Sequence, residues 1–274
     1  MSKSIVSTAV AGVLCALASQ AAVAAPDWSK VPKRDVHVFH AGVTPIEWMS
    51  KKSDHSGSAG MRKGETCIGC HEEKGALNFN FKRLADKELE PKGAPKTMSF
   101  PVGVQAAYDT ANLYIRLTFK APGGGADKGD KDNELKATLL FADAKVPQAD
   151  QYGCWQSCHA DARSMPGADE KKTKYTTAGA YELMQWASKG NKVADGSVAG
   201  ERKMSGGMAG AKAEAVKSGD SYTVTFTRKN PGEGKVVPIG VAIHADNSHG
   251  RFHHVSLGYK LGIGADGDIK AVKQ

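Results

Sequence analysis

The chain has 274 residues, 41% of them hydrophobic, which is enough for one large domain or two modest ones with a buried core. Its formal net charge is +8, but the lysines are spread along the chain without an arginine–aromatic pattern, which argues against nucleic acid as a partner. No stretch after residue 25 is long and apolar enough to cross a membrane, so we expect no stable membrane insertion of the mature protein.

The first 24 residues have the organisation of a secretory signal. Lys3 precedes an apolar run from Ile5 to Ala18, and Ala22-Val23-Ala24 is a small-x-small cleavage motif. The run is too short and too rich in alanine for a stable membrane anchor. We therefore predict that residues 1–24 are a signal peptide, and that the mature protein lies in a bacterial periplasm.

Residues 25–98 form the expected N-terminal haem-binding segment, because residues 67–71 read Cys-Ile-Gly-Cys-His. The thiols of Cys67 and Cys70, one helical turn apart, can form thioethers with one porphyrin, and His71 then lies beneath the iron as proximal ligand. A zinc site would need two more ligands at matching spacing, and a catalytic dithiol does not require the histidine. The motif predicts covalent haem c.

Residues 99–274 form the expected β domain, because apolar and polar residues alternate along several segments separated by turn residues. We expect strands over residues 102–108, 113–119, 135–141, 211–216, 222–228, 236–244 and 252–261. Residues 178–189 instead predict a helix, with Tyr181 and Met184 on one face. The predicted fold is mainly β, an antiparallel β-sandwich or open barrel with haem-bearing loops and short helices.

A second Cys-His motif interrupts the β domain at residues 154–159, which read Cys-Trp-Gln-Ser-Cys-His. Loss of Cys15 with the signal peptide leaves four cysteines, and all of them lie in the two motifs. A disulfide or a simple metal-binding pair is the alternative for Cys154 and Cys158. Because the pair ends in His159, as the first pair ends in a histidine, we predict a second covalent haem c.

Distal ligands for the two irons should come from the remaining histidines or from methionines. The candidates are His37, His40, His55, His244, His249, His253 and His254, with Met98, Met165, Met204 and Met208 as alternatives. The histidines form two clusters, one before the first motif and one in the last forty residues, which is suggestive for two irons. A vacant coordination position is a further alternative, and it would permit ligand binding or catalysis.

Two segments of the β domain carry a family resemblance, residues 106–117 (AAYDTANLYIRL) and residues 238–256, which include Arg-Phe-His-His-Val-Ser. They resemble the haem-binding domain of the gamma subunits of ethylbenzene dehydrogenase and dimethyl sulfide dehydrogenase. The resemblance implies a β-sandwich that binds haem. In that family the domain holds one b-type haem between a methionine and a lysine, and passes electrons from a molybdenum subunit.

This chain departs from the pattern of the gamma subunits in two places. His253 stands about where the family's lysine would fall, and the covalent motif at residues 154–159 is inserted where the gamma subunits have none. The chain therefore looks like a dihaem c-type variant of that domain, and residues 39–71 resemble the N-terminal portion of such variants. The resemblance implies His253 as the distal ligand of the second haem.

His55 is the expected distal ligand of the first haem, because the Gly/Ser-rich turn that follows it could fold it back over the iron. His40, His244 and His254 are close competitors for the two distal positions. These pairings are hypotheses that need the arrangement in space.

The expected function is electron transfer between redox partners of a respiratory chain. The partner would be a membrane quinol-oxidising cytochrome or a periplasmic oxidoreductase. The alternative is a haem enzyme or sensor in which one five-coordinate haem binds or converts a small molecule. A secreted β-sandwich with two disulfides and no haem is the third possibility.

Overall fold

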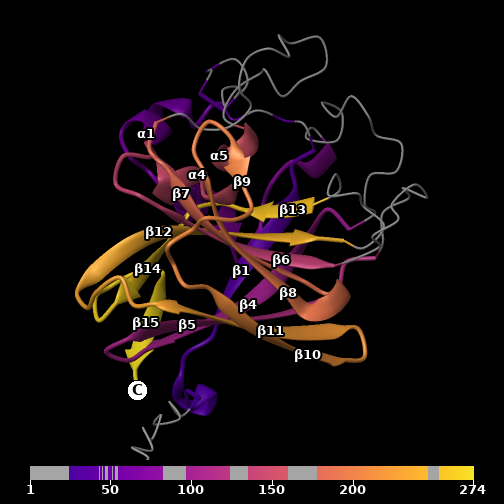
Figure 1. The fold of residues 1–274 in the computed structure, drawn as a ribbon. Helices are drawn as coiled ribbons and strands as arrows, with labels where there is room; N and C mark the ends of the chain where they lie inside the picture. Colours follow the sequence, from indigo (N-terminus) through magenta and orange to yellow (C-terminus); the bar gives the residue numbers. More distant parts are fainter. Residues whose placement is uncertain are drawn as a thin grey trace, which may run out of the picture.

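The computed structural model describes residues 25–42, 44, 46, 49–50, 52, 55–82, 97–123, 135–159, 178–245 and 253–274, the last two of residues 135–159 by backbone only. Figure 1 shows the arrangement of these residues. The predicted signal peptide at residues 1–24 lies outside them, as do His249 and Met165.

Strands are the main secondary structure of the described chain, and the helices are short. The strands are β1 (Arg34–His40), β2 (Glu72–Glu73), β3 (Ala76–Leu77), β4 (Ser99–Tyr108), β5 (Asn112–Lys120), β6 (Lys136–Ala142), β7 (Tyr181–Ala187), β8 (Lys192–Val198), β9 (Arg202–Lys203), β10 (Lys212–Ser218), β11 (Ser221–Lys229), β12 (Lys235–His244), β13 (His253–Ser256), β14 (Tyr259–Ile263) and β15 (Ile269–Lys273). The helices are η1 (Trp28–Lys30), α1 (Ser58–Arg62), α2 (Cys67–His71), α4 (Ala149–Tyr152), α5 (Cys154–His159) and η4 (Lys189–Asn191).

The strands form a curved sheet that closes on itself in its middle. One side has the order β10-β11-β5-β4 and the other the order β12-β6-β7-β8-β9. The pair β1–β13 joins β4 to β12 near one end, and the pair β15–β14 joins the same two strands near the other. All pairings are antiparallel except those of β15 with β14 and with β4. The predicted mainly-β, sandwich-like or barrel-like fold is confirmed.

The β4–β5 hairpin follows the predicted alternation. Val104 and Leu117 face each other across the pair and are fully buried. Asp109 forms the turn, where its carboxylate accepts hydrogen bonds from the backbone N–H groups of Ala111 and Asn112, both at 2.7 Å. Cross-strand burial of this kind explains why a period of two could be read from the sequence.

The helix predicted over residues 178–189 is wrong, because most of this segment is the strand β7. It pairs along its whole length with β6 on one side and β8 on the other. Leu183 and Met184 are neighbours in sequence, so their side chains lie on opposite faces of the strand, and both are buried. Because two apolar residues are adjacent, the strand lacks a clear alternation of apolar and polar residues. The helix propensity of its residues therefore predicted a helix, but pairing with the neighbouring strands determines the structure.

The short helices α1, α4 and α5 gather at one end of the strands, in the upper part of Figure 1. Helix α2 contacts α4, α4 contacts α5, and α5 rests on β12 and β13. Both Cys-His motifs begin in this cluster, since α2 and α5 are the helices that carry them. Strand β1, from the N-terminal segment, lies within the main sheet between β4 and β13.

Candidate haem-binding sites

The first motif coincides with helix α2. Thr66 precedes the helix in an extended conformation, and its side-chain oxygen accepts a hydrogen bond from Gly69 N at 3.2 Å. This N-cap fixes where the helix begins, so that Cys67, Cys70 and His71 lie on one short turn. Burial is the main reason that the pKa of the Cys67 thiol is raised, to about 12, with the neighbouring Cys70 adding to the shift.

His71 is oriented by a hydrogen bond that the sequence did not reveal. The chain turns back through β2 and β3, and Asn78 N donates to the His71 carbonyl at 2.8 Å. In the same place His71 Nδ1 donates to Asn78 Oδ1 at 3.0 Å. Burial lowers the pKa of His71, although the bond to Asn78 acts in the opposite direction. The bond from Nδ1 orients the ring and leaves Nε2 as the nitrogen that could bind a metal.

His55 faces His71 across a cavity of about 210 Å³. Their ring centroids are 5.9 Å apart, with 31° between the ring planes. His55 Nδ1 donates to the Met49 carbonyl at 3.0 Å, so His55 also keeps Nε2 for a metal. Cys67 and Cys70 line the same cavity. The structure thus brings together the attachment thiols, the predicted proximal histidine and the predicted distal histidine of the first site.

The second motif begins with Cys154, at the start of α5. Gly240 on β12 lets this helix approach, because a Cβ at residue 240 would lie 2.3 Å from Cys154 N. Gly153 precedes the helix with φ of 53°, and a Cβ there would meet the Leu257 carbonyl oxygen at 2.4 Å. The two glycines allow α5 to lie directly against the strands. The side chains of the motif's last two residues, Cys158 and His159, lie outside the described part of the chain.

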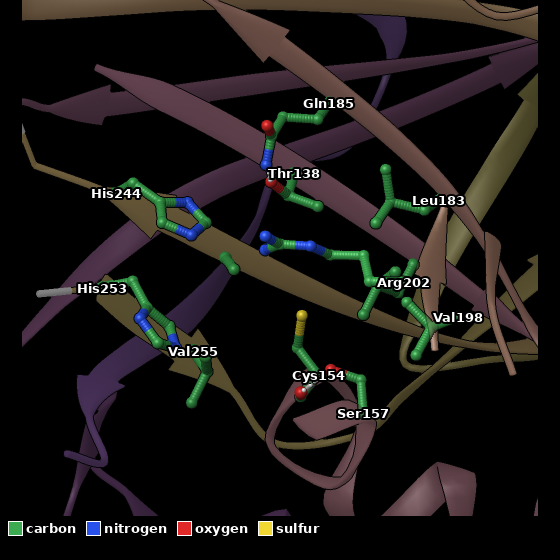
Figure 2. A pocket seen from close by; sticks show the side chains of 12 residues that line it. Thr138, Cys154, Ser157, Leu183, Gln185, Val198, Arg202, His244, His253 and Val255 are labelled. Atoms are coloured by element: carbon green, nitrogen blue, oxygen red, sulfur yellow. Dashed lines mark hydrogen bonds between the residues drawn. The ribbon is translucent and has the colours of Figure 1, made fainter. Parts of the chain in front are cut away.

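A cavity of about 230 Å³ lies between Cys154 and two histidines (Figure 2). His244 on β12 and His253 on β13 are register partners, with stacked rings whose centroids are 5.0 Å apart. Burial, followed by the proximity of His253, holds the pKa of His244 well below its ordinary value. A neutral imidazole is the form that binds a metal, so this histidine is ready as a ligand at neutral pH.

Arg202 is the one permanently charged side chain among the residues that line this second cavity. It comes from β9, and in Figure 2 its guanidinium reaches into the cavity toward His244. No carboxylate of the described chain is among the lining residues. Arg202 carries no signal in the sequence, because β9 is a two-residue strand with no apolar pattern.

His40 and His254 form a third histidine pair, which lines neither of these cavities. They are register partners on β1 and β13, with ring centroids 6.1 Å apart. His40 Nδ1 donates to the His253 carbonyl at 3.3 Å, and His254 Nε2 donates to the Thr97 carbonyl at 2.7 Å. Burial lowers the pKa of His254 to about 4. Because adjacent residues of a strand face opposite ways, His254 points away from the cavity that His253 lines.

The other described ligand candidates lie elsewhere. His37 is buried, with Nδ1 3.7 Å from a Glu72 carboxylate oxygen. Met208 is 84% exposed and Met204 is 37% exposed, in the loop before β10. The Met98 carbonyl accepts the backbone N–H of His40. None of these four side chains lines either cavity beside a Cys-His motif.

Comparison with known proteins finds one matching family and two similar proteins that are both named as cytochromes c. A family profile described as ethylbenzene dehydrogenase matches residues 25–235. Cytochrome c-551 of Rhodocyclus tenuis is 49% identical over 255 residues, which cover 91% of this chain and 100% of that protein. Cytochrome c-552 of Stutzerimonas stutzeri is 46% identical over 292 aligned residues, with 100% of both chains covered.

Among solved structures, the chain is similar to a family 9 carbohydrate-binding module from Caldicellulosiruptor kristjanssonii in complex with glucose. The TM-score is 0.33 at 10% identity, over 57% of this chain and 65% of the module. A likeness of this size supports no argument about function. Within the described residues, no helix has the length and apolar character that a membrane span requires.

Proposed function

We propose, because the chain belongs to the ethylbenzene dehydrogenase family, that it is a periplasmic dihaem c-type cytochrome that transfers electrons between redox proteins of a respiratory chain. Both curated relatives are named as cytochromes c, which supports covalently bound haem c in this chain. The observation that carries the proposal is that each Cys-His motif begins beside a cavity that also contains a candidate distal histidine. Bound haem supplies a reversible one-electron couple between ferric and ferrous iron.

At the first site the residues fit a covalent haem with two histidine ligands. Cys67 and Cys70 would attach it, and His71 and His55 would bind its iron. The hydrogen bonds from Nδ1 of both histidines to oxygen acceptors hold the rings in place and keep both Nε2 atoms available. The protein therefore holds this pair in position without help from the porphyrin.

At the second site the proposal assigns attachment to Cys154 and Cys158 and proximal ligation to His159. His253 is the proposed distal ligand, and His244, stacked on it at 5.0 Å between ring centroids, is its competitor. Both histidines come from strands in the middle of the sheet, which is a rigid support for a ligand. The fit rests on the donor set and on the cavity that Cys154 shares with the two imidazoles.

Two histidine ligands for each iron leave no coordination position for a substrate, which favours electron transfer over catalysis or sensing. The formal charge of +8 supports an acidic docking surface on the partner. A membrane quinol-oxidising cytochrome or a periplasmic oxidoreductase fits this role. Export by the predicted signal peptide would place the protein with such partners.

The spin state of the purified protein tests this function. We expect two low-spin haems whose absorption spectra do not change under carbon monoxide, because every axial position is filled. In His55→Ala and His253→Ala, one of the two haems should become high-spin and bind carbon monoxide. His40→Ala is the matched control, a buried histidine that lines neither cavity, and it should keep both low-spin signals.

A high-spin haem that binds carbon monoxide in the unaltered protein would contradict the electron-carrier proposal and support the enzyme or sensor. A loss of one low-spin signal in His40→Ala, with no change in His253→Ala, would overturn the assignment of the second distal ligand. The same measurements therefore distinguish a wrong functional proposal from a wrong assignment of the distal ligand.

A further inference from the structure

A continuous series of aromatic contacts connects the two Cys-His helices. His71 on α2 contacts Phe79 with ring centroids 4.8 Å apart. Phe79 contacts Phe39 at 5.0 Å, and Phe39 contacts Trp155 on α5 at 5.2 Å. The interplanar angles are 71°, 88° and 89°, so each contact is edge-to-face, an arrangement that aromatic rings favour. Residues from four separate segments thus meet in one row.

Phe39 is the fixed member of this row. It is fully buried, and its strand β1 is paired on both edges, with Phe39 opposite Val255 of β13 and Ser99 of β4. Trp155 is 3% exposed, and its indole N–H donates to the Thr44 carbonyl at 2.9 Å. Neither ring has room to move, because closely packed interiors fix side chains in single positions.

A second contact ties the same two regions independently. Gln151 lies on α4, directly before the second motif, and its side-chain amide donates to the carbonyls of Met61 at 2.9 Å and Glu65 at 2.6 Å. These two residues lie just before the first motif. The aromatic row therefore joins the two attachment helices, and the Gln151 amide joins the segments that directly precede them.

We propose that Phe39 is a positioning residue that sets the placement of the two haems relative to each other, acting through Phe79 on the ring of His71 and through Trp155 on helix α5. This inference rests on the proposed dihaem function. In a dihaem carrier the separation and mutual orientation of the two haems govern how strongly they interact. A rigid row of rings between the two motifs fixes both quantities.

The test compares Phe39→Leu with the unaltered protein, both in the oxidised dihaem form. Electron paramagnetic resonance reports the g values of each ferric haem and the magnetic interaction between the two, which depends on their distance and orientation. We expect Phe39→Leu to keep two covalent haems by mass but to change the interaction between them. Phe226→Leu is the matched control, because Phe226 is equally buried (1% exposed) but lies on β11, away from both motifs.

Phe79 provides a milder pair of variants in case Phe39→Leu does not fold, because Phe79 is only partly buried. Phe79→Tyr keeps the ring and should keep the interaction between the haems, whereas Phe79→Leu removes the ring and should change it. An unaltered interaction in Phe39→Leu, or in Phe79→Leu if only that variant folds, would overturn the positioning role. A mass with fewer than two haems in the unaltered protein would instead overturn the proposed function.

Discussion

His55 and His71 face each other with 5.9 Å between their ring centroids, and each is held by a hydrogen bond from Nδ1 to an oxygen outside the pair. Met49 supplies one oxygen from the backbone, and Asn78 supplies the other from a side-chain amide. Such outer partners set ring orientation and raise the basicity of a ligating imidazole. The first haem site is therefore organised by residues that would not themselves touch iron.

The Asn78 contact predicts an ordered series of reduction potentials for the first haem. A stronger acceptor at Nδ1 makes His71 a more basic ligand, which stabilises ferric iron and lowers the potential. We expect Asn78→Asp to lower the potential and Asn78→Leu to raise it, with the unaltered protein between them. Spectroelectrochemical titration of the three proteins measures the order. Equal potentials would show that this hydrogen bond does not tune the haem.

The contact of Gly240 with Cys154 predicts that Gly240→Ala disturbs the second site. The added Cβ would lie 2.3 Å from Cys154 N, so α5 must shift away from β12. We expect a loss of about 1–3 kcal/mol in the free energy of unfolding, as for other overpacked sites, and incomplete attachment of the second haem. Chemical denaturation and intact mass measure the two effects.

Gly123→Ala is the control for that substitution, because a Cβ at residue 123 meets no atom within 4 Å. It should leave both stability and haem content unchanged. A Gly240→Ala protein with normal stability and full haem content would show that α5 can move off β12 without consequence.

The position of Arg202 predicts an electrostatic effect on the second haem. Its guanidinium reaches into the cavity in Figure 2, and a nearby cation favours the ferrous state, which carries one positive charge less. We expect Arg202→Gln to lower the potential of the second haem. Lys203→Gln makes the same change of charge on the next residue, but Lys203 does not line the cavity and is paired with Glu201 at 2.9 Å. As the control, Lys203→Gln should shift the reduction potential of the second haem less than Arg202→Gln does. Equal shifts of the potential in the two variants would contradict a local role for Arg202.

The hydrogen bond from Tyr114 to Asp109, beside the β4–β5 turn, leads us to predict that the free energy of unfolding falls at alkaline pH. Burial, and next the hydrogen bond to Asp109, raise the pKa of Tyr114 to about 12 from its ordinary value of 10.0. Between these two pH values the unfolded chain binds fewer protons than the folded chain, so the free energy of unfolding falls as pH rises. Tyr114→Phe should flatten this fall in chemical denaturation across that range. If the free energy of unfolding of Tyr114→Phe fell with pH as steeply as that of the unaltered protein, groups other than Tyr114 would be responsible for the loss of stability.

The sequence predicted the parts of the site in which the spacing of cysteines and histidines determines the chemistry. Cys67, Cys70 and His71 occupy one short helix, as the motif requires, and the facing position of His55 agrees with the expectation that the chain folds back. Strands β4 and β5 were also predictable, because their large apolar side chains alternate with small or polar ones.

The remaining features depend on contacts that no local pattern encodes. Strand β7 carries buried apolar side chains at the adjacent positions Leu183 and Met184, which interrupts the alternation. Asn78 reaches His71 only because a short hairpin returns the chain, and Gly240 matters only because α5 approaches it from a distant segment. His244 and His253 become neighbours through the pairing of β12 with β13. Each of these relationships depends on a turn, a strand pairing or the approach of another segment, none of which sequence periodicity reports.

The central claim is that both Cys-His motifs carry covalent haem, and intact mass spectrometry of the exported protein tests it most directly. We predict a mass equal to the mature chain plus two haems. We also predict the loss of one haem in Cys67→Ser/Cys70→Ser and of the other in Cys154→Ser/Cys158→Ser. A single haem in the unaltered protein, with a mass that does not respond to the Cys154→Ser/Cys158→Ser change, would contradict it.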